Sequence, residues 1–232
     1  MYDNTTENGR RNFIGKLAAG AATISLATIA TPLKASEKII SDNSIDPSNP
    51  DDLFKNINGK HKVVFDVTQP HEIYPFAWPR VFLLTNQATG TPEKENSVIV
   101  VLRHTAIGYA MDNRIWEQYP IGDVFKANDP VTQQASKRNP FWKPAAGAFT
   151  IPGFGPIPIG INELQESGVK FMVCDAAMTV YSAAVAQAMG KDAAEVRKDW
   201  NAALLPGMSL VPSGVWALGR AQEKGCAYIF AG

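Results

Sequence analysis

The sequence has 232 residues with 22 basic and 22 acidic side chains, and 45% of its residues are hydrophobic. A chain of this length forms about one compact domain with additional segments. Its balanced charge argues against a nucleic-acid-binding protein, which needs a basic face. The two cysteines are too few for the disulfide framework of a small secreted domain.

The first 35 residues have the pattern of an export signal. The pair Arg10 and Arg11 precedes an uncharged stretch from Leu17 to Leu33, and Ala35 follows as a cleavage position. This pattern resembles the twin-arginine signal of bacteria. We expect residues 1–35 to be a signal peptide that directs the protein to the periplasm, so that only this segment meets a membrane. A retained membrane anchor is the alternative, although the stretch is short and rich in Gly and Thr for a spanning helix.

Residues 36–60 are rich in Ser, Asp, Asn and Pro and are predicted to be a linker. From residue 62 onward, short apolar runs alternate with amphipathic stretches. This alternation predicts an α/β fold over residues 62–232, with an open five-stranded parallel sheet between helical layers. The predicted strands cover 62–68, 97–103, 169–174, 209–211 and 226–230, and the predicted helices cover 77–88, 108–119, 162–167, 176–189, 192–205 and 213–224.

Residues 120–160 interrupt this alternation with a long segment rich in proline. The segment also carries five aromatic residues, which are Phe125, Phe141, Trp142, Phe149 and Phe154. Loops of this length without regular structure are uncommon in compact domains, and the aromatic content is too high for a solvated linker. We expect an ordered cover over a site or a contact between subunits, with a decorated surface loop as the alternative.

Three residues suited to chemistry follow predicted strands. His71 follows the first strand, His104 follows the second, and Cys174 ends the third. Because ligands bind beyond the carboxyl ends of the strands in open parallel sheets, we predict that these three residues form a site at one edge. A copper-type metal site is an alternative for the same residues, but no local spacing supports it. The sequence contains no motif for a nucleotide or dinucleotide and no serine-hydrolase elbow, so we expect no cofactor.

Cys174 directly precedes a predicted helix, where unpaired amides and the helix dipole favour a thiolate. The neighbouring Asp175 opposes this effect unless its carboxylate turns away to cap the helix, and a charged His104 nearby would reinforce it. The alternative is a small buried cysteine with no chemical role. Cys226 begins the last strand and should lie at the opposite edge of the sheet. A disulfide between the two is therefore not expected, and Cys226 is predicted to be structural.

The strand that ends in Cys174, the Ala-rich helix after it and the run Val211-Pro212-Ser213-Gly214-Val215 resemble the DsrE/DsrF-like family of sulfur-relay proteins. The resemblance covers residues 62–232 and implies a flavodoxin-like domain that forms homo-oligomers. In sulfur-carrier members, a cysteine at this strand end holds a persulfide and passes it to a partner protein. The resemblance transfers that role to Cys174 alone.

The sequence therefore predicts an exported protein that handles sulfur or thiols through a persulfide on Cys174, as a sulfur carrier or sulfurtransferase with a donor or acceptor protein as partner. The alternative is a non-catalytic module of the same fold, in which the aromatic residues of segment 120–160 hold a small ligand or a neighbouring subunit.

Overall fold

The structure is a computed structural model that describes residues 49–151, 153 and 155–232. The expected signal peptide (1–35), the first part of the expected linker and Phe154 lie outside these residues. In the part of the chain that is described, no helix is long and apolar enough to cross a membrane.

Five parallel strands form the central sheet, as the apolar runs predicted. Their spatial order is β6-β5-β2-β1-β7, so that β7 lies beside β1 at one edge. The fold is therefore an α/β fold of the flavodoxin-like kind. The strands are β1 (Lys62–Val67), β2 (Ser97–Leu102), β5 (Lys170–Cys174), β6 (Met208–Val211) and β7 (Ala227–Phe230).

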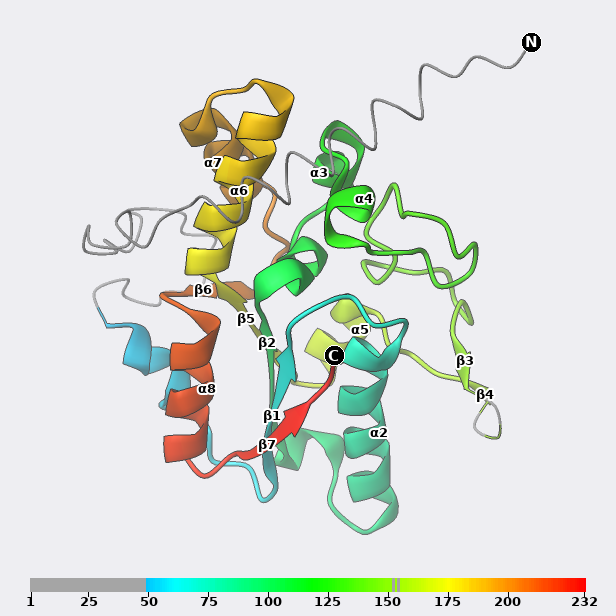
Figure 1. The fold of residues 1–232 in the computed structure, drawn as a ribbon. Helices are drawn as coiled ribbons and strands as arrows, with labels where there is room; N and C mark the ends of the chain where they lie inside the picture. Colours follow the sequence, from blue (N-terminus) through cyan, green and yellow to red (C-terminus); the bar gives the residue numbers. More distant parts are fainter. Residues whose placement is uncertain (1–48, 152, 154) are drawn as a thin grey trace.

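Helices cover both faces of the sheet. Helices α2 (Tyr74–Ala88) and α8 (Gly214–Glu223) lie on opposite sides of it (Figure 1). Side chains alternate along each strand, so Phe65 points into the larger core beneath α2, whereas Val64 packs in a smaller core with α8. A short helix, α5 (Ile161–Glu166), packs against α2.

The remaining helices gather beyond the carboxyl ends of the strands (Figure 1). Helix α6 begins where β5 ends, packs against α7 and contacts η4, which follows β2. This group extends the larger core past the edge of the sheet. It consists of the 3-10 helix η4 (His104–Ala110) and of α3 (Asn113–Gln118), α4 (Ile121–Phe125), α6 (Asp175–Met189) and α7 (Ala193–Ala202).

The helix predicted over residues 108–119 is instead two separate pieces, η4 and α3. Met111 between them is extended and bridges to Leu204. Asp112 then starts α3, because its carboxylate accepts a hydrogen bond from the Ile115 amide. A side-chain cap and a strand-like bridge therefore override the helical spacing of the apolar residues.

Residues 50–60, which were predicted to be the end of a linker, are part of the folded unit. Residues Pro50–Phe54 form a 3-10 helix, η2, that contacts α8. Phe54 and Ile57 are buried in the smaller core, and the ring of Phe54 packs edge-on against that of Trp216. The polar composition of this segment conceals two core residues in the sequence.

The proline-rich segment 120–160 is ordered because its aromatic residues are part of the core. Phe141 is fully buried and packs against Phe76, Tyr109 and Phe149. Phe125 packs against the ring of Tyr181 in α6 and the ring of Trp200 in α7. The segment also contains α4 and a small hairpin of β3 (Thr150–Ile151) and β4 (Gly155–Pro156). The buried rings Phe125, Phe141 and Phe149 are not presented to a ligand or a second subunit, contrary to one of our expectations.

Substitution of Phe141 by Ala should lower the free energy of unfolding by about 3–5 kcal/mol, because it leaves a cavity among three aromatic rings. Val131→Ala, in the same segment, is a control, since Val131 is 69% exposed and its loss should have almost no effect. Urea unfolding of both variants measures the difference. Equal stabilities would mean that the segment does not belong to the core.

Candidate functional site

The carboxyl edge of the sheet contains the point at which the connections change sides. The chain leaves β5 through α6, which packs in the larger core, and leaves β6 through α8, which packs in the smaller core on the opposite face. Cys174 and Val211 end these two neighbouring strands in register. Helices that diverge in this way from adjacent strands create the crevice in which α/β proteins bind ligands. Cys174 therefore lies where the fold favours a site.

Cys174 is also the N-cap residue of α6. Its Sγ atom accepts a hydrogen bond of 3.3 Å from the Ala177 amide, and the residue is 7% exposed. An amide that points at the sulfur, together with the dipole of a 15-residue helix, stabilises negative charge on that atom. The side chain is thus buried, but its sulfur meets a polar group.

Asp175 does not direct its charge toward the sulfur beside it. Its carboxylate forms an ion pair with Arg197 of α7. Burial lowers the pKa of the Arg197 guanidinium, and the Asp175 carboxylate acts in the opposite direction. This pairing neutralises the negative neighbour that the sequence analysis identified as unfavourable for a Cys174 thiolate.

A buried charged pair crosses the same edge of the sheet. Asp66 near the end of β1 is 1% exposed. Both of its oxygens accept hydrogen bonds from Arg103, from Nε to Oδ1 at 2.7 Å and from Nη2 to Oδ2 at 2.9 Å. The Tyr228 hydroxyl of β7 donates a third hydrogen bond of 2.8 Å to Oδ2. Three strands thereby share one carboxylate, which satisfies a charge that would otherwise be costly to bury.

Arg103 lies beside the cysteine at this edge, because Leu102 and Val173 pair in register and Arg103 and Cys174 directly follow them. The pKa of Arg103 is raised, first by its hydrogen bond to Asp66 and also by the charge of that carboxylate. The Arg103 side chain remains 28% exposed, so it is accessible from solvent.

Gly214 at the start of α8 makes room for Arg103. A Cβ atom at this position would lie 2.6 Å from Cβ and 2.9 Å from Cδ of Arg103. Non-bonded carbon atoms do not approach one another this closely. The Arg103 side chain can therefore lie against the first turn of α8 only because residue 214 is a glycine. Ser213 caps the helix by accepting a hydrogen bond from the Trp216 amide.

The two predicted histidines lie at the same edge but have other neighbours. The His104 ring packs edge-on against Tyr181, with ring centroids 5.4 Å apart, and its backbone is left-handed. His71 is exposed and packs against the ring of Tyr74. Among the hydrogen bonds of the described residues, none joins either histidine to Cys174. The basic residue that the strand register places beside Cys174 is Arg103, which directly precedes His104 in the sequence.

The two cysteines are not joined, and the predicted site residues are not arranged as metal ligands. Cys174 and Cys226 are both free thiols, and Cys226 is buried in the smaller core, where burial raises its pKa. His71, His104 and Cys174 do not form a cluster, and no group of three or more His, Cys, Asp or Glu side chains in residues 49–232 is arranged to hold a metal ion.

Comparisons with known proteins add little to this geometry. No protein-family model and no curated protein matches the sequence. One solved structure, of a protein of unknown function from Methanobacterium thermoautotrophicum, shares 19% sequence identity with this chain. The match covers 74% of this chain and 99% of that one, with a TM-score of 0.37.

Tyr228→Phe tests the three-strand network. Loss of a hydrogen bond to a charged group at a partly exposed position should lower the free energy of unfolding by about 1 kcal/mol. Tyr74→Phe is the matched control, because no hydrogen bond of the Tyr74 hydroxyl is found in the described part of the chain. Chemical denaturation at pH 7 measures both variants, and equal effects would contradict a role for the Tyr228 hydroxyl.

The pH dependence of stability offers an independent test. Burial raises the pKa of Tyr228, and its hydrogen bond to Asp66 raises it further. The unfolded chain therefore releases the phenol proton first, near pH 10, and the stabilisation from the neutral phenol is present below that pH and lost above it. Wild type should lose stability above pH 10 more steeply than Tyr228→Phe, as measured by urea unfolding at several pH values. Parallel curves would contradict this coupling.

Proposed function

We propose that the protein handles sulfur or thiols through Cys174, which carries a persulfide. The observation that supports this role best is the environment of Sγ, which accepts the Ala177 amide hydrogen at the start of α6, at a strand end that lies beside that of Arg103. Both groups stabilise the thiolate, which is the reactive form of cysteine. The resemblance to sulfur-relay proteins at the same strand end points to the same chemistry.

The proposed transfer needs no external oxidant. The Cys174 thiolate attacks the terminal sulfur of a donor persulfide, so that a new S–S bond forms and the donor S–S bond breaks. The donor leaves as a thiolate, and Cys174 now carries the persulfide. A thiolate on an acceptor protein then attacks the terminal sulfur and restores the Cys174 thiolate. Arg103 stabilises the Cys174 thiolate before the first step and after the second.

The same proposal includes the cellular setting. We propose that residues 1–35 act as a twin-arginine signal that takes the protein to the periplasm, where its partner is a sulfur donor or acceptor protein. We also propose that the protein acts as a homo-oligomer. Expression of the full chain with and without Arg10→Lys and Arg11→Lys tests the export step. Equal amounts of both forms in the periplasm would contradict it.

Incubation with a low-molecular-weight persulfide tests the transfer itself. The wild-type protein should gain one sulfur atom in mass under native conditions, and Cys174→Ser should gain none. Cys226→Ser is the matched control, because it removes the other thiol and should leave the gain unchanged. A gain that follows Cys226 instead of Cys174, or no gain before denaturation, would contradict the proposal.

Alkylation kinetics test the role of Arg103. Loss of an adjacent positive charge should slow the alkylation of Cys174 at pH 6 by about tenfold in Arg103→Gln. Gly214→Ala should slow it in the same direction, since the added methyl displaces the arginine. His104→Ala is the comparison variant and should have little effect, because the His104 ring contacts Tyr181. A large effect of His104→Ala with none of Arg103→Gln would reassign the role to the histidine.

A further inference from the structure

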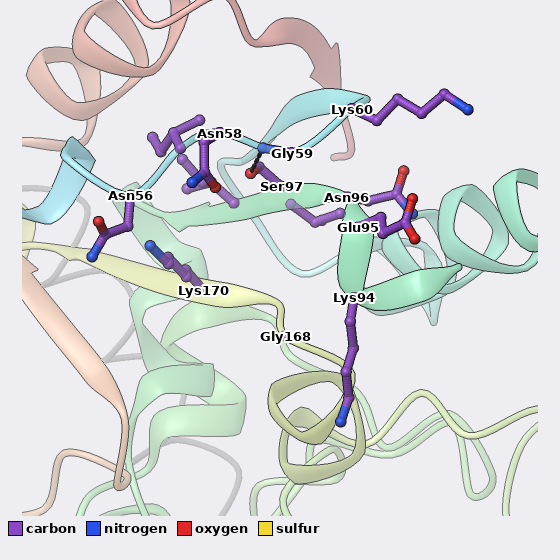
Figure 2. Close-up of a pocket in the computed structure, with 13 residues that line it drawn as sticks. Asn56, Asn58, Gly59, Lys60, Lys94, Glu95, Asn96, Ser97, Gly168 and Lys170 are labelled. Carbon is purple, nitrogen blue, oxygen red and sulfur yellow. Dashed lines mark hydrogen bonds between the residues drawn. The ribbon is translucent and has the colours of Figure 1, made fainter. Parts of the chain in front are cut away.

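A second cavity lies at the amino ends of the strands, on the opposite edge of the sheet from Cys174. Its volume is about 480 Å³, which is within the range of small-molecule sites. The lining comes from the segment that precedes β1, the start of β2 and the start of β5 (Figure 2). Residues far apart in the sequence therefore form one enclosure here.

The cavity carries a net positive charge. Lys60, Lys94 and Lys170 line it, against the single carboxylate of Glu95. In the described ranges, none of these three lysines has an acidic group within ion-pair distance. Partial burial lowers the pKa of Lys170, which means that its ammonium group lacks part of its solvation. An anion bound beside it would compensate for this loss.

One lysine and two asparagines of the lining can act together on an anion. Figure 2 shows Lys170 extending toward Asn56 and Asn58, whereas Lys60 and Lys94 extend away from it, toward the rim. The two asparagine amides offer hydrogen-bond donors next to the ammonium group. The side chains of Ile57, Val98 and Ile99, which also belong to the lining, are buried in the cores.

Tight backbone contacts fix the shape of this cavity. The Gly59 amide donates a hydrogen bond of 2.9 Å to Ser97 Oγ, and the Lys60 amide donates one of 2.7 Å to the Glu95 carbonyl. A Cβ atom on Gly59 would lie 2.4 Å from the Ser97 amide nitrogen. The segment before β1 is therefore held directly against the start of β2, which fixes the backbone of this part of the lining.

We propose that this cavity binds a small anion, whose phosphate or carboxylate group lies between Lys170 and the amides of Asn56 and Asn58. Charge-assisted hydrogen bonds to Lys170 provide most of the affinity. The site is independent of Cys174, since it lies at the other edge of the sheet.

Titration with phenyl phosphate tests this proposal, with amide NMR shifts as the readout. The shifts should concentrate at Gly59, Ser97 and Lys170, and Lys170→Gln should weaken binding by at least about tenfold. Lys198→Gln is the matched control, because it removes an equally exposed lysine from α7 and should leave binding unchanged. Cys174→Ser should also bind as wild type does, which separates this site from the proposed sulfur chemistry.

Two further probes test whether binding depends on the negative charge. Inorganic phosphate should bind at the same residues, and benzyl alcohol, which lacks the charge, should not bind. Asn58→Ala should weaken binding as well, and it provides a second variant if Lys170→Gln alters the fold. Shifts spread over many surface lysines, or equal affinity in Lys170→Gln and Lys198→Gln, would overturn the proposal.

Discussion

Asp66 brings a negative charge into the sheet, at a position that faces the smaller core beneath α8. A carboxylate in such surroundings is tolerated only when it is fully paired. Arg103 at the end of β2 and Tyr228 in β7 provide three hydrogen bonds to it. One buried charge thereby links three strands and fixes the position of a guanidinium at the carboxyl edge, and the proposed chemistry at Cys174 depends on that position.

The second requirement for the site is the arrangement of its helices. Because α6 and α8 leave neighbouring strands toward opposite faces, their first turns lie at the ends of β5 and β6, which is where α/β proteins bind ligands. Cys174 occupies the first of these turns, and Gly214 in the other allows Arg103 to approach. The environment of the sulfur thus follows from the directions in which α6 and α8 leave the sheet and from the lack of a side chain at Gly214.

The apolar runs predicted the five strands and most of the long helices, since buried parallel strands and amphipathic helices have distinct periodicities. The sequence also located Cys174 at a strand end. It did not show that Arg103 would lie beside Cys174, because that requires the strand order β5-β2-β1-β7, which periodicity does not contain. The one sign of this arrangement in the sequence was Asp66, which is the only charge inside a run of Val and Phe. The rings of segment 120–160 could not be assigned to the core, because their partners, such as Phe76 and Tyr109, lie far away in the sequence.

The position of β7 also affects how the domain is assembled. Strand β1 pairs with β7 across a separation of more than 160 residues, and such distant contacts slow folding because a long loop must close first. During synthesis β1 has no neighbour on that side until residues 227–230 leave the ribosome, and Asp66 lacks its tyrosine partner until the same moment. The nascent chain therefore carries an open sheet edge beside an incompletely paired charge until residues 227–230 have been made.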